Sequence, residues 1–193
     1  MERITLASAS PRRLDFFRLL GLPFDCEPAD IDETPPPGLS PRQVAEDLAL
    51  KKTLAVVGRT SANRWVFGAD TVVALDGGIR GKPEDRDEAR RTLGLLSGRR
   101  HEVTTAMALH DRLRGETDLR SATCEVEFAP LSPDEIEWYL ETGEWQGAAG
   151  GYRLQERGAC LIKSINGSPS AVAGLPLREF YVMLSENGYR FGA

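Results

Sequence analysis

The amino-terminal residues have the clearest chemical potential in the chain. A short apolar stretch, Ile4-Thr5-Leu6, leads into Ala7-Ser8-Ala9-Ser10-Pro11-Arg12-Arg13, and a helical pattern of apolar residues begins directly after it. Backbone N–H groups at the start of a helix are free to bind an anion, the helix dipole favours negative charge there, and a guanidinium group binds phosphate oxygens with two parallel hydrogen bonds. The segment therefore predicts a turn from strand to helix that binds a phosphorylated ligand.

Asp70 interrupts an apolar, β-branched run from Trp65 to Leu75 that is typical of a strand buried on both faces. A carboxylate in such a run costs free energy unless it is paired, bound to a metal or solvated in a cleft. Two interpretations remain open at this point. Asp70 is either a catalytic base or a magnesium ligand beside a phosphate, or an aspartate at the end of the strand that bonds to a neighbouring backbone N–H.

Four further polar residues are candidates for binding a phosphorylated ligand, and each has a plainer alternative. Glu33 lies in an acidic loop stiffened by a run of prolines, and Lys52 lies on a predicted helix, where such side chains mostly face water. Lys82 is better placed, because the glycine before it permits close approach of a ligand and the proline after it fixes the backbone. Gln155 either reads a base edge through its amide or satisfies a strand edge.

Composition and motif content exclude several classes of function. The 193 residues carry a formal net charge of -5, whereas nucleic acid and anionic membranes demand a broad basic surface. No apolar segment approaches the roughly twenty residues that span a bilayer, so we expect a cytoplasmic protein. Cys26, Cys124 and Cys160 are widely spaced, which indicates buried or incidental thiols in a reducing compartment. His101 and His110 lack a nearby serine or cysteine partner, so triad chemistry is not supported.

The elements that must position these residues alternate between helix and strand along the chain. Periodicity and capping signals predict strands at 4–6, 24–27, 65–75, 101–110 and 118–128, and helices at 11–20, 41–58, 85–96, 133–143 and 175–187. A turn is predicted at Asp76-Gly77-Gly78, and the apolar stretch 159–165 follows a glycine-rich segment at 147–151. This interleaving predicts an α/β protein with a mixed sheet.

Taken together, these pieces resemble the Maf family in their order and spacing. The resemblance covers nearly the whole chain and rests on a set of motifs: Ala7-Ser8-Ala9-Ser10-Pro11-Arg12-Arg13, Asp32-Glu33, Leu48-Ala49 with Lys52, Gly68-Ala69-Asp70-Thr71-Val72-Val73, Gly81-Lys82-Pro83, Leu96-Ser97-Gly98 with His101, Tyr152 with Gln155, and Gly174-Leu175-Pro176-Leu177. The resemblance implies one inosine triphosphatase-like domain over residues 1–193. Its expected fold is a mixed, elongated, twisted sheet flanked by helices, which could form two lobes around a central cleft.

The resemblance also implies an activity. Maf proteins are nucleoside triphosphate pyrophosphatases, which cut between the α- and β-phosphates with a divalent metal, Mg²⁺ or Mn²⁺. One branch of the family acts on dTTP and UTP, with an arginine after Ser-Pro and a threonine after the aspartate. The branch that prefers 7-methyl-GTP tends to have tryptophan and glutamine there. Arg12 and Thr71 make this chain similar to the dTTP/UTP branch, and Gln155 matches the third position associated with specificity.

Residue roles and partners follow from the resemblance in the same way. Asp70 is expected to activate water and, with Glu33, to hold the metal. Pyrimidine recognition is assigned to Thr71 and Gln155. The resemblance further suggests a homodimer and a nucleoside triphosphate substrate, while the acidic net charge argues against nucleic acid or a membrane as a partner. The residues expected to neutralise the triphosphate are Ser8, Arg12, Arg13, Lys52 and Lys82.

The carboxyl-terminal part of the chain departs from the family pattern. Gly147-Ala148-Ala149-Gly150-Gly151-Tyr152 stands where the family usually has Asp-Lys-Ala-Gly-Ala-Tyr, so that a carboxylate and a lysine are lost. Glu156 replaces a usual glycine, and Pro169 and Ala171 replace a tyrosine and an asparagine. These departures leave open a second hypothesis, that the chain is a nucleotide-binding regulator of cell division with weak or no catalysis.

Overall fold

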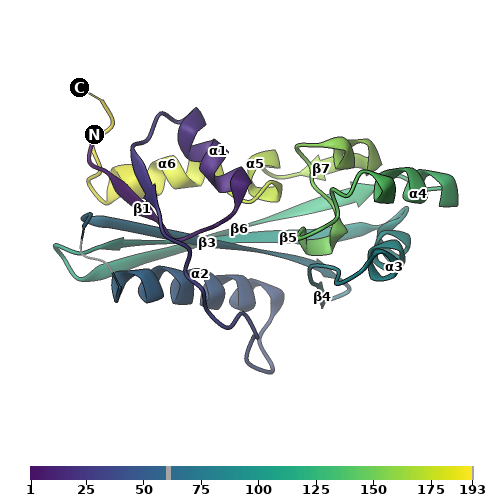
Figure 1. The fold of residues 1–193 in the computed structure, drawn as a ribbon, viewed down its shortest axis with the longest axis horizontal. Helices are drawn as coiled ribbons and strands as arrows, with labels where there is room; N and C mark the ends of the chain where they lie inside the picture. Colours follow the sequence, from purple (N-terminus) through teal and green to yellow (C-terminus); the bar gives the residue numbers. More distant parts are fainter. Residues whose placement is uncertain (60–61, 193) are drawn as a thin grey trace.

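An elongated mixed sheet forms the centre of the molecule in the computed structural model, which describes residues 1–59 and 62–192 (Figure 1). Within these residues the sheet has seven strands, in the order β2-β1-β3-β5-β6-β7 with β4 paired to β3. Pairing is parallel between β1 and its two neighbours and antiparallel elsewhere. The bounds of the strands are β1 (Ile4–Leu6), β2 (Phe24–Cys26), β3 (Trp65–Leu75), β4 (Gly78–Arg80), β5 (Arg100–Asp111), β6 (Glu116–Phe128) and β7 (Ile162–Asn166). The predicted α/β class with a mixed sheet is confirmed.

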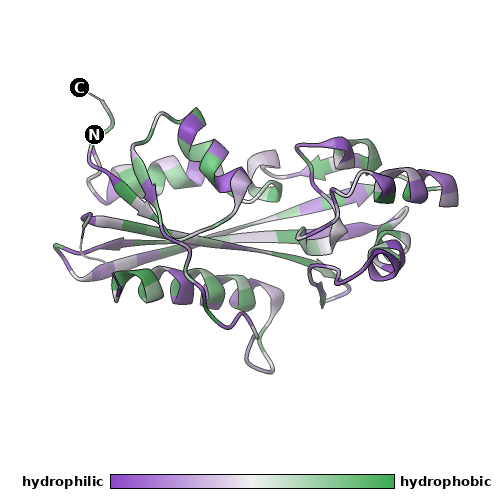
Figure 2. Ribbon diagram, in the orientation of Figure 1, coloured by the Kyte–Doolittle hydropathy of each residue, from purple (hydrophilic) through white to green (hydrophobic). Residues whose placement is uncertain are grey.

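Helices cover both faces of this sheet (Figure 1). Their bounds are α1 (Pro11–Leu19), α2 (Pro41–Val57), α3 (Arg86–Leu96), α4 (Pro133–Glu141), α5 (Pro169–Val172) and α6 (Leu177–Glu186), with 3₁₀ turns η1 (Ala149–Gly151) and η2 (Arg157–Leu161). In Figure 1, α2 lies below the sheet and α1, α5 and α6 lie above it. Figure 2 shows hydrophobic and hydrophilic residues alternating along α2, as expected of a helix with one face against a sheet.

The predicted helix starts are confirmed where a capping residue precedes a proline. Ser40 and Ser132 each accept a hydrogen bond from the third helical N–H, and the side chain at that third position bonds back to the cap. Asp85 caps α3 in a related manner by accepting from the amide of Glu88. Local chemistry therefore fixes where α2, α3 and α4 begin.

The long strand β3 carries two apolar clusters on one face. Toward its start, Trp65 and Phe67 pack with α1 and α6, and toward its end Val73 and Leu75 pack with α3 and α4. Thr71 lies on the same face between the two clusters, because side chains alternate along a strand. The polar site thus lies between two apolar cores, which agrees with the expectation of two lobes around a central cleft.

The short elements β4, α5 and η1 were not predicted, and the stretch 159–165 was predicted only as apolar. Asp76 and Gly77 have positive φ angles and form the predicted turn, yet the returning strand β4 has three residues and shows no alternation of its own. The elements α5 and η1 are also too short for a period to appear. Residues Arg157–Leu161 form η2, so that β7 begins only at Ile162.

The cysteines and histidines are not among the residues that line the pocket described below. Cys26 and Cys160 are exposed, Cys124 is buried, and all three are free thiols. Of the expected buried or incidental thiols, Cys124 is a buried one, whereas Cys26 and Cys160 are exposed. His101 and His110 are buried. None of the helices in the described part of the chain has the length and apolarity needed to cross a membrane.

Candidate active site

An open edge of β3 creates the site. Strand β1 pairs with β3 over Trp65–Phe67, and β4 pairs with the same edge over Val73–Leu75. Between these two pairings, within the described part of the chain, residues 68–72 have a strand partner only on the β5 side. Asp70 and Thr71 point to opposite faces of the sheet. Both side chains reach this gap, because no strand covers the edge of β3 between β1 and β4.

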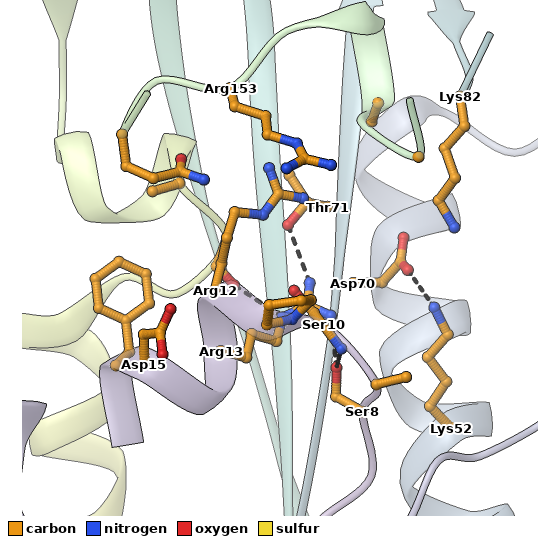
Figure 3. Close-up of a pocket in the computed structure, with 18 of the residues that line it drawn as sticks. Ser8, Ser10, Arg12, Arg13, Asp15, Lys52, Asp70, Thr71, Lys82 and Arg153 are labelled. Atoms are coloured by element: carbon orange, nitrogen blue, oxygen red, sulfur yellow. Dashed lines mark hydrogen bonds and ion pairs between the residues drawn. The ribbon is translucent and has the colours of Figure 1, made fainter. Parts of the chain in front are cut away.

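A cavity of about 1070 Å³ occupies the gap and is lined by all nine residues predicted for the site. Figure 3 shows the labelled side chains converging from α1, α2, β3 and the segments around residues 82 and 153. The predicted residues in its lining are Ser8, Arg12, Arg13, Glu33, Lys52, Asp70, Thr71, Lys82 and Gln155. Six different parts of the sequence thus supply one cavity.

Asp70 and Glu33 share the ammonium group of Lys52. The Lys52 Nζ lies 2.6 Å from Asp70 Oδ1 and 2.7 Å from Glu33 Oε1, and Lys82 Nζ lies 3.3 Å from Glu33 Oε2. Asp70 is only 8% exposed, lies in the middle of β3 and accepts a hydrogen bond from Lys52. The alternative of an aspartate at the strand's end, bonded to a backbone N–H, is therefore wrong.

The electrostatics of Glu33 favour its ionised form. Partial burial raises the pKa of this carboxyl, but the hydrogen bond from Lys52 and the charges of Lys52 and Lys82 outweigh that effect and lower the pKa overall. Asp32 helps to shape the loop by accepting the backbone N–H of Thr34 at 2.9 Å. Glu33 is thus a charged residue held over the cavity, and not merely a solvated loop residue.

Gly68 allows α2 to approach β3 closely enough to place Lys52 beside Asp70. A Cβ atom at this position would lie 2.4 Å from Thr53 Oγ1 and 3.1 Å from the carbonyl oxygen of Ala49, both on α2. Thr53 in turn donates to the Ala49 carbonyl at 2.9 Å. The glycine of the Gly68-Ala69-Asp70 motif is therefore a requirement of helix packing.

Arg13 is the buried cation at the floor of the cavity. Its guanidinium donates to the Gly174 carbonyl at 3.0 Å, to Thr71 Oγ1 at 3.1 Å and to Ser8 Oγ at 3.4 Å. Burial lowers the pKa of this guanidinium to about 10, partly offset by the charge of Asp70, so it remains protonated at neutral pH. Because the hydrogen-bond partners of Arg13 are neutral, its positive charge is available to an anion.

The turn from β1 to α1 offers an anion fewer free backbone N–H groups than the sequence predicts. Pro11 has no N–H group, and the Arg13 amide donates to the Ser10 carbonyl at 3.1 Å. Ser10 makes no side-chain capping bond. The side chains of Ser8, Arg12 and Arg13 therefore carry most of the anion-binding capacity of this segment.

The residues predicted to recognise a base differ in their surroundings. Thr71 is engaged inside the protein, since its hydroxyl bonds to Thr105 Oγ1 at 2.8 Å as well as to Arg13. Gln155 is exposed and lines the cavity, whose outer part also includes Asp15, Phe16 and Leu19. Residues of α1 and of the segment around Gln155 thus line one and the same cavity.

Of the carboxylate and the lysine that the glycine-rich segment lacks, only the carboxylate, at Gly147, falls in the cavity wall. Ala148 is fully buried, and within the described residues the lining includes Gly147 and Ala149 but not Ala148. Gly150 donates to the Gly81 carbonyl at 3.0 Å, and a Cβ atom on it would touch Val73 at 3.0 Å. The segment is therefore a packing element that supports the Lys82 turn.

Two contributors to the site had no role assigned from the sequence. Gly174 supplies a carbonyl group to Arg13, which a motif match cannot reveal because the interaction is made by the backbone. Arg153 lines the cavity two residues before Gln155. Arg153 stands directly between the motif residue Tyr152 and the turn that carries Gln155, and this position in the motif is the signal that could have found it.

The carboxylates of Glu33 and Asp70 suit a divalent cation that is bound partly by substrate and water, and not one that is held by protein ligands alone. In the described residues no group of three or more histidine, cysteine, aspartate or glutamate side chains could hold a metal ion. Mg²⁺ is usually bound by one or two carboxylates together with substrate phosphates and water. The ammonium of Lys52 between Glu33 and Asp70 shows that these two carboxylates converge on one positive charge.

The fold and the cavity define an α/β protein with a binding site for a highly charged anion, in which a carboxylate pair faces several cations. Residues 3–187 match the family described as Maf-like protein. The chain belongs to the Maf family, as the motifs in its sequence indicate.

Proteins similar to this chain over nearly its whole length have related names. A dTTP/UTP pyrophosphatase of Symbiobacterium thermophilum is 45% identical over 98% of this chain and 96% of its own length. A dTTP/UTP pyrophosphatase of Pelotomaculum thermopropionicum is 43% identical over 98% of each chain. Among solved structures, the Staphylococcus aureus Ham1 protein matches with a TM-score of 0.47 and 19% identity, covering 67% of this chain and 73% of that one.

Proposed function

We propose that this protein is a nucleoside triphosphate pyrophosphatase that hydrolyses dTTP and UTP to the monophosphate and pyrophosphate. The observation that carries the proposal is the single cavity in which Asp70 and Glu33 face Arg12, Arg13, Lys52 and Lys82. A triphosphate needs several cations to neutralise it, and hydrolysis needs a carboxylate to accept a proton from water. The relatives named dTTP/UTP pyrophosphatase support the same substrates.

Asp70 is proposed as the general base. Lys52 donates to its Oδ1, and within the described residues Oδ2 has no hydrogen-bond partner, so this oxygen is available to accept a proton from water. The water attacks the α-phosphorus in line, while Lys52, Lys82, Arg12 and Arg13 stabilise the negative charge that develops on the pyrophosphate leaving group. Ser8 orients Arg13 and offers its hydroxyl to a phosphate oxygen.

Glu33 and Asp70 are the residues that would hold a divalent cation, Mg²⁺ or Mn²⁺. Such an ion supplies charge neutralisation at the phosphates when it is bound. Lys52 contacts both carboxylates in this structure, so its ammonium must share them or give them up when the cation binds with substrate.

Base selection is proposed to depend on Gln155 directly and on Thr71 indirectly. The exposed amide of Gln155 can donate to one pyrimidine carbonyl and accept from the ring N–H. Thr71 holds Arg13 through its hydroxyl, so we assign it a positioning effect on the cation beside the substrate. A preference for 7-methyl-GTP is the alternative outcome for this subsite.

The direct experiment is a panel of nucleoside triphosphates with Mg²⁺ or Mn²⁺, in which pyrophosphate and orthophosphate are measured separately. Release of pyrophosphate from dTTP and UTP supports the proposal. Nucleotide binding without release supports the alternative of a regulator of cell division, and orthophosphate release indicates a general phosphatase. Faster turnover of 7-methyl-GTP than of the pyrimidine nucleotides overturns the assigned base preference.

We also propose a homodimer with a cytoplasmic location, as the family resemblance suggests. Free nucleotides and free thiols such as Cys26 and Cys160 are typical of that compartment. Light scattering coupled to size exclusion measures the oligomeric state directly, and a mass near that of one 193-residue chain contradicts the dimer.

A further inference from the structure

Arg153 lines the same cavity as the residues discussed above but has no part in the function proposed so far. Figure 3 shows it entering from the side of the cavity opposite α1, with its guanidinium group beside that of Arg12. Two questions decide what it can do: whether its backbone is fixed, and whether its charge is free.

The backbone of Arg153 is held firmly. Its N–H donates to the hydroxyl of Tyr139, a buried residue, at 3.2 Å. Gly158 packs against it so closely that a Cβ atom on this glycine would lie 2.5 Å from the Arg153 carbonyl oxygen. Any movement of Arg153 is therefore confined to its side chain.

The side chain of Arg153 is held by weaker contacts. The guanidinium donates to the Gln146 carbonyl at 2.8 Å and to Glu156 Oε1 at 3.3 Å. In that ion pair the Arg153 side chain is 31% exposed and the Glu156 side chain 37% exposed. An exposed pair of this kind contributes little free energy, so a ligand carrying more negative charge can displace Glu156.

Arg12 faces Arg153 without a carboxylate of its own. Among the described residues, no hydrogen bond or ion pair engages the Arg12 side chain. Burial and the positive charge of Arg153, whose guanidinium lies beside that of Arg12 in Figure 3, lower the pKa of the Arg12 guanidinium, and the charge of Glu156 partly offsets them. Lys52 and Lys82, by contrast, are already paired with Asp70 and Glu33.

We propose that Arg153 is a further substrate-binding residue, which together with Arg12 binds the phosphate oxygens of the triphosphate between two guanidinium groups. Glu156 holds Arg153 over the cavity until the triphosphate takes its place. The identification of the anion as a triphosphate rests on the proposed function, whereas the anion site itself rests on the two facing guanidinium groups.

The test measures binding of inorganic tripolyphosphate, which has the phosphate chain without a nucleoside, by isothermal titration calorimetry. We expect Arg153→Ala to weaken binding about tenfold or more, since it removes charge-assisted hydrogen bonds. Arg153→Lys should restore part of the loss, because lysine keeps the charge but lacks the planar fork. Glu156→Gln should tighten binding about twofold by removing the competing carboxylate.

Arg157→Ala is the matched control, because it removes the same charge from the next turn of the chain outside the cavity lining. Its tripolyphosphate affinity should equal that of the wild type. Equal losses in Arg153→Ala and Arg157→Ala overturn the proposal, because a general charge effect then explains both. A loss for dTTP with unchanged tripolyphosphate binding also overturns it, since Arg153 would then contact the nucleoside.

Two parallel measurements keep the outcomes separate. Thermal unfolding checks that each variant is folded, and if Arg153→Ala is not, the tighter binding expected for Glu156→Gln still decides the question. Pyrophosphate release by the wild type is measured in the same series. Its absence overturns the proposed function, while the tripolyphosphate affinities continue to test the role of Arg153.

Discussion

The pair formed by Lys52 and Asp70 illustrates how a single charged residue is tolerated in an otherwise apolar strand. Each side chain is 11% exposed, so neither charge is well solvated. Removing Lys52 would leave the carboxylate of Asp70 uncompensated, at a typical cost of about 3–5 kcal/mol, whereas removing Asp70 leaves Lys52 paired with Glu33. Placing a carboxylate in a buried strand costs free energy even when it is paired. The presence of Asp70 there indicates that its carboxylate serves function more than stability.

The substitution Asp70→Asn tests that role. It keeps the shape of the side chain but removes the acceptor of the proton, so we expect turnover of dTTP to fall about 10²- to 10⁴-fold while nucleotide binding persists. Steady-state kinetics and calorimetry measure the two quantities separately.

Asp76→Asn is the control for this experiment. Asp76 lies in the turn that follows the same strand, has a φ of 52° and pairs only at the surface with Arg99. Asparagine tolerates such a backbone conformation well. Near-normal turnover in Asp70→Asn, or an equal loss in Asp76→Asn, contradicts the assignment of Asp70 as the base.

Residue types and spacing predicted which side chains gather in the site, but not how they are paired. All nine candidates line one cavity, because each belongs to a motif with a chemical reason for its residue type. The pairing of Lys52 with Asp70 depends on how α2 lies against β3, and the sequence has no local signal for that. The roles of the nine residues remain predictions until they are measured.

At the scale of elements, the approach of α2 to β3 depends on Gly68. We expect Gly68→Ala to destabilise the protein by about 1–3 kcal/mol, because the added methyl group overpacks against Thr53 and the α2 backbone. The displaced helix should also carry Lys52 away from Asp70 and lower the turnover of dTTP. Urea unfolding and steady-state kinetics together measure both effects.

Gly94→Ala provides the comparison, because Gly94 lies in α3 and a Cβ atom there meets nothing within 4 Å. Alanine is preferred to glycine in a helix by about 0.8–1 kcal/mol, so this variant should gain stability with unchanged turnover. If Gly68→Ala is as stable and as active as the wild type, close contact between α2 and β3 is not required.

Elements with strong local signals were predictable, and those without them were not. The strand 65–75 and the helix beginning at Pro41 agree with the structure because length, periodicity and capping all favour the same state. The short strand β4 and helix α5 have too few residues for any period. The open edge of β3, which creates the site, follows from where β1 ends and β4 begins, and is therefore a property of the assembled sheet.

For the whole molecule, we expect one cooperative unfolding transition, since the chain is predicted to form a single domain over residues 1–193. Its stability should depend on pH through His101. This ring is buried against Phe128, its Nε2 lies 2.8 Å from the Tyr152 hydroxyl, and burial lowers its pKa to about 4. The unfolded chain binds a proton near pH 6.5 and the folded chain only near pH 4, so the free energy of unfolding falls as the pH falls between these values.

The size of this effect is at most about 3.4 kcal/mol, from the difference between the two pKa values. Urea unfolding between pH 7 and pH 4.5 measures it, and His101→Gln should reduce the slope with pH. His110→Gln separates the smaller contribution of His110, whose pKa is lowered by burial and by the charge of Arg112. An unchanged slope in His101→Gln contradicts the assignment to His101.

The central claim, that water attacks the α-phosphorus of a pyrimidine nucleoside triphosphate, is tested most directly by hydrolysis of dTTP in ¹⁸O-labelled water. Mass spectrometry of the products then shows which phosphorus received the oxygen. We predict that the label appears in the thymidine monophosphate and that the pyrophosphate is unlabelled. Label in the pyrophosphate, or the appearance of labelled orthophosphate, would contradict the claim.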